Sequence, residues 1–364
     1  MALSLSIITL IIIVSCTFGF SRLLQTEIIA IFSIQFFSLL IFIQSLGMFI
    51  ASIYVDSLIR KIGLFRLVLM AKVCLIEIAI AQIYLSDFRW QIFLFLLFGF
   101  FNNILLLCIQ SVVRPLVSKF LNPLMSILMN CGRAIGSLIL LVDKKYHLII
   151  FLCVFLGSFL PYTTINIKHK HLFQIEGKNY NSDLLSFIIY YNYFFWICFL
   201  FFLMENLLNT YLIIVLYNLF YSSSITLLVL LLFSFYMGKL LLYFPFQWMS
   251  YYLSPRNKLI FMCLLSIICF LIILNFRESN LIFGISLFLL GGITTDLPLQ
   301  DYFFQLKKTK HLSWFITSNQ IRNVVLLCFS IVGIIAIQLD LISGLFKMGL
   351  FLSFINLILL YVNV

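Results

Sequence analysis

The chain of 364 residues is 64% hydrophobic and only 10% charged, with a mean hydropathy of +1.18. Water-soluble domains are about half apolar and about a quarter charged, so this composition excludes a soluble fold and predicts a membrane protein. The net charge of +11 does not indicate nucleic-acid binding, because the basic residues are dispersed over short loops instead of gathering on one face.

Apolar runs follow one another along the chain, and each is long enough to cross a hydrocarbon core of about 30 Å as a helix. None shows the strict alternation of barrel strands, so we predict an all-α, polytopic membrane protein with about twelve transmembrane helices. The predicted spans cover residues 5–21, 30–54, 63–86, 91–113, 121–142, 147–166, 186–213, 222–248, 258–275, 280–305, 312–338 and 342–363.

The longest polar interval, from Asn166 to Asp183, separates the sixth span from the seventh. We therefore expect an N-terminal six-helix bundle over residues 1–166, a cytoplasmic linker over 167–185 and a C-terminal six-helix bundle over 186–364. His169 and His171 in this linker have the spacing of metal ligands, but no further ligands cluster nearby. We expect no metal and no cofactor.

Lys and Arg residues are unevenly distributed between alternate loops. If the chain starts in the cytoplasm, thirteen Lys and Arg residues fall on the cytoplasmic side and six on the other side. Cytoplasmic loops carry the excess of Lys and Arg in membrane proteins. We therefore expect both termini in the cytoplasm.

Two short basic hairpins repeat across the halves, one after the second span and one after the eighth. Arg66 in the first and Lys258 in the second are 192 positions apart, close to half the chain length. Two parallel six-helix repeats produce such a spacing, so we interpret the chain as a duplication.

The first hairpin resembles the loop between helices 2 and 3 of the major facilitator superfamily, and more closely a bacterial subgroup that reads L-I-R-x-x-G-x-x-R. The matching residues are Leu58, Ile59, Arg60, Gly63 and Arg66. The second hairpin is similar to the subgroup's corresponding motif at Gly238, Pro245 and Ser250.

This resemblance implies a monomeric secondary transporter of a small solute, working by alternating access in the inner (plasma) membrane of a bacterium. It also implies that a cytoplasmic gating loop is formed by Asp56, Arg60, Gly63 and Arg66. Tyr251 stands where the subgroup has an aspartate, which leaves open a non-transporting scaffold protein derived from a transporter.

Ionisable residues within spans are functional candidates, because each costs a few kcal/mol in a bilayer. We expect proton coupling or a substrate cavity at Glu77, Arg133, Glu205, Asn209, Asp296, Asp301 and Arg322. Glu205 either carries the coupled proton, since burial raises a carboxyl pKa, or serves as a structural partner for Lys239. Arg322 either grips an anionic substrate or, as we favour, pairs with Asp301 or Asp296.

Enzyme signatures are missing from the sequence. It contains no P-loop, no H-E-x-x-H motif and no nucleophile elbow, so we expect neither an enzyme nor an ATP-driven pump. The aromatic, charge-poor surroundings of the seventh span favour a neutral or amphiphilic small solute.

Overall fold

The fold was determined as a computed structural model, and the part of the chain that it describes consists of helices and the turns between them. The described residues are 34–85, 87–116, 130–131, 133–143, 146, 149–150, 153, 192–220, 224–276, 279–293, 299, 302, 321–322, 324–326, 328–329, 331–333, 335 and 343–362. The predicted first span and almost all of the predicted sixth span lie outside these residues.

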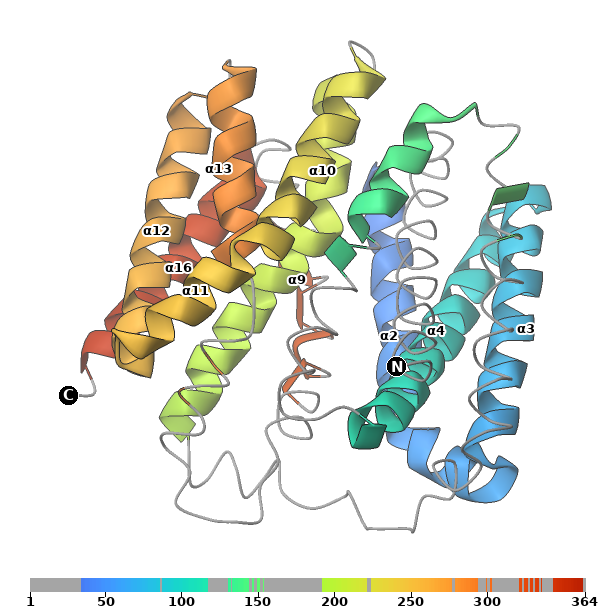
Figure 1. The fold of residues 1–364 in the computed structure, drawn as a ribbon. Helices are drawn as coiled ribbons and strands as arrows, with labels where there is room; N and C mark the ends of the chain where they lie inside the picture. Colours follow the sequence, from blue (N-terminus) through green and yellow to red (C-terminus); the bar gives the residue numbers. More distant parts are fainter. Residues whose placement is uncertain are drawn as a thin grey trace. The chain divides into compact units, whose positions relative to one another are not determined.

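The chain divides into two compact units, Met1–Asn179 and Tyr180–Val364. Within the described part of unit 1, three long helices follow one another: α2 (Ile34–Ile62), α3 (Leu64–Tyr84) and α4 (Phe88–Leu116). A short 3₁₀ helix, η1 (Ile139–Leu141), comes later in the same unit. Helix α4 packs against both α2 and α3 (Figure 1).

Two glycines bring α2 and α4 into backbone contact. A Cβ atom added at Gly47 would lie 2.1 Å from the carbonyl oxygen of Leu96, and one added at Gly99 would lie 2.0 Å from that of Gln44. Neither distance is compatible with a side chain, so the small residues permit this close crossing.

Helix α2 ends later than predicted. It continues through Ile62, and the turn into α3 is made at Gly63, whose φ of +86° is a conformation that other residues rarely adopt. Residues 56–61, expected as a loop, are therefore helical. The physical reason is that residues 48–62 contain no glycine or proline that would end the helix before Gly63.

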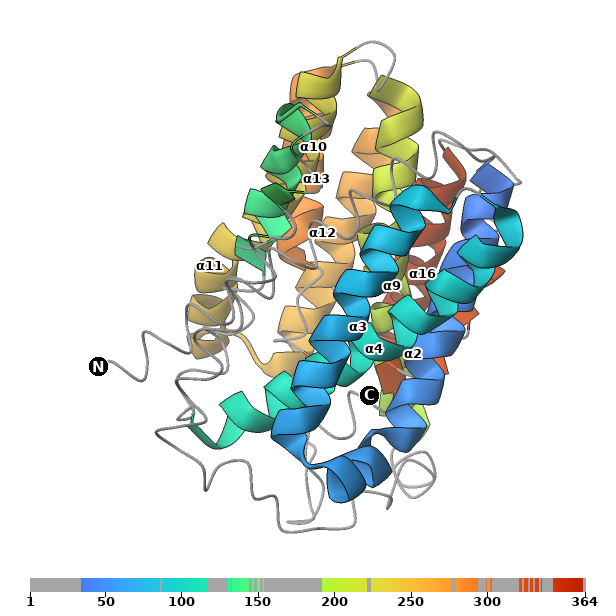
Figure 2. The same cartoon turned by 90° about the vertical axis from the view of Figure 1, so that its right-hand side faces the viewer.

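Unit 2 contains most of the described helices. They are α9 (Asn192–Phe220), α10 (Ile225–Leu241), α11 (Tyr243–Trp248), the 3₁₀ helix η3 (Met249–Tyr251), α12 (Pro255–Asn275), α13 (Asn280–Ile293) and α16 (Ser343–Val362). Helix α10 packs on α9 and α13, while α12 packs on α13 and α16, and α16 also packs on α9 (Figure 2).

The glycine crossing of unit 1 recurs in unit 2. A Cβ added at Gly238 in α10 or at Gly291 in α13 would lie within 2 Å of a backbone oxygen of the other helix. Gly238 lies 191 positions after Gly47, and Gly291 lies 192 positions after Gly99. The same helix crossing is therefore built twice, at the spacing that the two hairpins share.

The connection between α10 and α12 is fixed where α12 begins. The Ser254 hydroxyl accepts a hydrogen bond from the Asn257 backbone N–H and caps α12, which begins at Pro255. Arg256 then donates from Nε and Nη2 to the carbonyl oxygen of Leu360, at 3.0 and 2.5 Å. This guanidinium satisfies a carbonyl in the last turn of α16, where a positive charge is favourable.

Among the described residues, five helices are long and apolar enough to cross a membrane. They are Phe88–Cys108, Asn192–Leu216, Ile225–Phe246, Pro255–Asn275 and Ser343–Val362. Each falls on a predicted span, and the all-α membrane fold is confirmed. The total of about twelve spans stays a prediction.

Candidate functional site

Helix α9 carries two of the buried polar residues of unit 2. Glu205 and Asn209 are separated by four positions, so their side chains lie on one face of the helix. Both residues are less than a tenth exposed. The remaining residues of this helix are almost all apolar, which makes this face its most polar region.

Lys239 of α10 reaches across to this face of α9. Its Nζ donates to Oδ1 of Asn209 at 2.8 Å and lies 3.8 Å from Oε1 of Glu205. The ammonium also lies 5.3 Å from the centroid of the Phe235 ring, one helical turn earlier on α10. Lys239 is buried, so its long side chain lies within the contact between the two helices.

Arg322 reaches Glu205 on the second carboxylate oxygen. Its Nη1 lies 2.9 Å from Oε2 of Glu205, and its guanidinium carbon lies 4.0 Å from the centroid of the Phe202 ring. Phe202 precedes Glu205 by one turn on α9, so the same helix supplies both the anion and the aromatic face. Guanidinium groups bind aromatic faces in this way.

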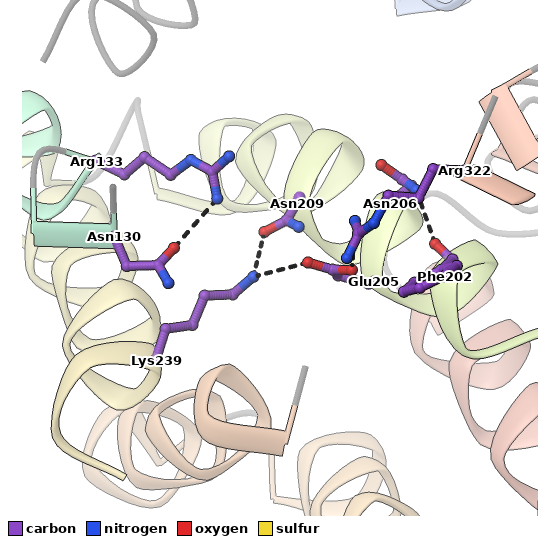
Figure 3. A network of polar contacts seen from close by, with 8 residues as sticks. All are labelled: Asn130, Arg133, Phe202, Glu205, Asn206, Asn209, Lys239 and Arg322. Atoms are coloured by element: carbon purple, nitrogen blue, oxygen red, sulfur yellow. Dashed lines mark hydrogen bonds and ion pairs between the residues drawn. The ribbon is translucent and has the colours of Figure 1, made fainter. Parts of the chain in front are cut away.

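We call Glu205, Asn209, Lys239 and Arg322 the polar cluster (Figure 3). In it, one carboxylate lies between two cations, and the two contacts differ in length by almost 1 Å. Ion pairs are strong where the dielectric constant is low, but each charge is costly to bury. A change in the protonation of Glu205 would therefore alter both contacts at once.

The structure pairs Arg322 with Glu205, and this was not the partner we favoured from the sequence. Asp296 and Asp301 lie outside the described residues, so the expected pairs with them stay predictions. Lys239, which the sequence suggested only as a structural partner of Glu205, makes its shortest contact with Asn209.

The candidates in unit 1 lie in different surroundings. Glu77 lies on the exposed side of α3. Arg133 is half-buried and donates from Nη1 to Oδ1 of Asn130 at 3.1 Å, one turn earlier in the chain. The contact of Arg133 with Asn130 lies within one turn of the chain.

The predicted gating residues lie around the turn between α2 and α3. Arg60 and Arg66 are exposed on either side of Gly63. The backbone of Asp56 belongs to the last turns of α2, and its side chain is outside the described part of the structure. The turn therefore carries three exposed cations, Arg60, Lys61 and Arg66, next to a glycine with positive φ.

The described residues contain no group of three or more His, Cys, Asp or Glu side chains that could hold a metal ion. The chemistry that the polar cluster itself can perform is proton exchange at the carboxylate, and hydrogen bonding through the ammonium, guanidinium and amide groups.

Comparison with known proteins identifies the fold. The sequence matches no family model and no curated protein. The structure is similar to the crystal structure of the nucleoside transporter NupG, with 13% identity, a TM-score of 0.70 and coverage of 100% of this chain and 98% of that chain. It is similar also to the crystal structure of a point mutant of NupG, with 12% identity, a TM-score of 0.67 and coverage of 99% and 98%. Both neighbours are described as nucleoside transporters, and the chain shares their fold over its whole length.

Proposed function

We propose that this chain is a secondary transporter that moves a small solute across a membrane by alternating access. The observation that carries the proposal is the polar cluster, in which three charged side chains and an amide are gathered on largely apolar helices. Ionisable groups at membrane depth are expensive and mark solute or proton pathways. The fold shared with a transporter supports the same function.

The solute that this cluster suits best carries both hydrogen-bond donors and acceptors. Glu205 and Asn209 provide acceptor oxygens, whereas Lys239 and Arg322 provide donors. Hydroxyl groups and ring nitrogens match this mixture better than a purely apolar or a multiply charged solute. Nucleosides have these groups, and both structural neighbours are nucleoside transporters, so nucleosides are the first solutes to test.

Glu205 is the proposed proton carrier. When the carboxylate is protonated, it loses its charge and its attraction for Arg322 and Lys239 falls. Lys239 keeps its hydrogen bond to Asn209 at 2.8 Å, so the link between α9 and α10 persists. The contact with Arg322 weakens most, which would free the segment around residue 322 to move against α9.

The test is a transport assay in liposomes that hold the purified full chain, with a panel of nucleosides and an internal pH dye. We expect solute-driven proton uptake in the unchanged chain and its loss in Glu205→Gln, which keeps the shape but not the charge. Asp87→Asn is the matched control, because Asp87 is an exposed carboxylate that is not among the candidate residues, and it is expected to keep the activity.

Other results would have different meanings. Solute flux without proton movement would contradict proton coupling but not transport. Absence of flux for a broad panel of solutes, in vesicles with verified insertion, would contradict transport and favour the scaffold alternative. Equal losses in Glu205→Gln and Asp87→Asn would contradict the assignment of Glu205.

The turn between α2 and α3 is the proposed cytoplasmic gating loop. Its cations, Arg60 and Arg66, are exposed, and Gly63 provides a tight turn through its positive φ. Asp56, Arg60 and Arg66 would form a charge network that breaks when the transporter changes state. We propose in addition that the chain is a monomer in a bacterial inner membrane, with both termini in the cytoplasm.

A further inference from the structure

The segment that joins α10 to α12 is unusually aromatic. Residues 243–252, which form α11, η3 and the turn after them, contain no charged side chain. Two of its aromatic residues are buried against unit 2, Tyr243 and Phe246. Four others have exposed fractions between 59% and 81%: Phe244, Trp248, Tyr251 and Tyr252. We call these four residues the aromatic face.

Two members of the aromatic face share one side of α11. Phe244 and Trp248 are four positions apart in this helix, and Tyr251 and Tyr252 follow at the end of η3 and in the turn after it. The buried residues Tyr243 and Phe246 point the other way. One side of the segment therefore packs on the protein, and the other presents large rings outward.

The segment is held in place by contacts with the helices around it. Helix α11 packs on α10 and η3 packs on α12. The rings of Trp248 and Tyr252 lie edge to face, with centroids 4.9 Å apart. The Ser254 cap and the Arg256 contact with Leu360 fix the start of the next helix. The outward rings are thus presented by an ordered backbone.

The position of the segment along the chain indicates its depth. The membrane-spanning stretch that starts in α10 ends at Phe246, and the next begins at Pro255. Phe244 lies in the last turn of the first stretch, and Trp248, Tyr251 and Tyr252 lie between the two stretches, where the chain would leave and re-enter a membrane. Trp and Tyr are enriched at this level, because an apolar ring with one polar group suits the boundary between hydrocarbon and water.

We propose that the aromatic face lies in the headgroup layer of the bilayer and anchors unit 2 at one membrane surface. Four large rings exposed to water would form an apolar patch without a compensating partner. The absence of charge on the segment disfavours a soluble, charged protein as its occupant. This inference is independent of the transported solute and of transport itself.

Trp248 is a natural fluorescent probe for this proposal, because the chain has only four tryptophans. In the full chain, the other three are replaced by phenylalanine (Trp90→Phe, Trp196→Phe and Trp314→Phe), and the variant is placed in phosphatidylcholine vesicles. Trp248 emission is then quenched by lipids labelled near the headgroup, by lipids labelled deep in the acyl chain, and by iodide in the water. We expect quenching by the shallow lipid label to be about twofold stronger than by the deep label.

The matched control moves the probe to the buried side of the same segment. In the single-tryptophan background, Phe246→Trp combined with Trp248→Phe is expected to show weak quenching by all three quenchers, since Phe246 is buried. Circular dichroism verifies the fold of both variants. If the triple phenylalanine variant does not fold, the difference in emission between the unchanged chain and Trp248→Phe gives the same measurement.

Three outcomes would overturn the proposal. Quenching by iodide alone would place the aromatic face in water. Resistance to all three quenchers would mean that protein covers it, either another segment of this chain or a second copy. Strongest quenching by the deep label would place it within the hydrocarbon core and not at the surface.

Discussion

At the scale of single residues, we expect the loss of the contact between Arg322 and Glu205 to destabilise the folded protein more than the loss of any other contact described in the polar cluster. Arg322→Gln removes the cation nearest to Oε2 of a buried carboxylate, and a buried charge that loses a partner costs about 1–3 kcal/mol. We expect a lower unfolding temperature for purified protein in detergent. Adding Glu205→Gln to Arg322→Gln should recover part of the loss, because the buried negative charge is then gone.

Arg322→Lys serves as the control, because lysine keeps the charge but cannot place a planar guanidinium over the Phe202 ring. Its loss of stability should be smaller than that of Arg322→Gln. If the double variant were as unstable as the sum of the two single variants, the two residues would not be energetically coupled.

The sequence predicted the individual residues of this cluster better than their partners. Glu205 and Asn209 stood out because polar residues in an apolar helix are rare, and a spacing of four positions places them on one face. The partner of Arg322 could not be deduced, because 117 positions separate it from Glu205 and only tertiary packing decides which carboxylate it meets. The contact between Arg322 and the Phe202 ring could not be predicted from the sequence, since phenylalanine is common throughout the chain.

At the scale of elements, the crossing of α10 and α13 depends on glycine. A Cβ at Gly238 would lie 1.8 Å from the carbonyl oxygen of Phe288, so Gly238→Ala must force the two helices apart, at a cost of about 1–3 kcal/mol. Gly284→Ala, on α13, is the control: its Cβ would meet only Leu231 Cδ2, at 3.5 Å.

Thermal unfolding followed by circular dichroism measures both variants. Gly238→Ala should lower the unfolding temperature clearly, whereas Gly284→Ala should leave it unchanged or raise it, because alanine favours helix over glycine. Similar unfolding temperatures for the two variants would show that α10 and α13 do not approach as closely as the structure indicates.

Hydrophobicity predicted where the helices lie but not where they bend or touch. The predicted span 222–248 is two helices, because the chain turns at Leu242 and Pro245 follows. The close crossings described above are made by pairs of glycines on different helices, which no pattern within a single span indicates. A search for glycines repeated within one position of the spacing of the two hairpins would have found them.

At the scale of the whole molecule, the duplication predicted from the hairpins agrees with the repeated glycine crossing, which appears at the same spacing in both units. The orientation of the termini stays a prediction, since charge in loops decides it and no membrane is part of the structure. Because the helices of each unit pack on one another, we can test whether one unit folds without the other.

We expect the fragment 180–364 to insert and fold without the first unit, because its helices pack on one another. The control is a shorter fragment, 223–364, which lacks α9 and therefore loses the contacts of α10 and α16 with that helix. Many large side chains of α9 are buried, among them Phe194, Phe202 and Tyr211. Removing this helix therefore exposes apolar surface within the unit, and it also deletes Glu205 and Asn209.

Circular dichroism and protease resistance in detergent should show a cooperative unfolding transition for 180–364 and a weaker or absent one for 223–364. A missing transition for 180–364 would show that the second unit depends on the first for its stability. Equal cooperative transitions for both fragments would show that the packing around α9 is not what holds the unit together.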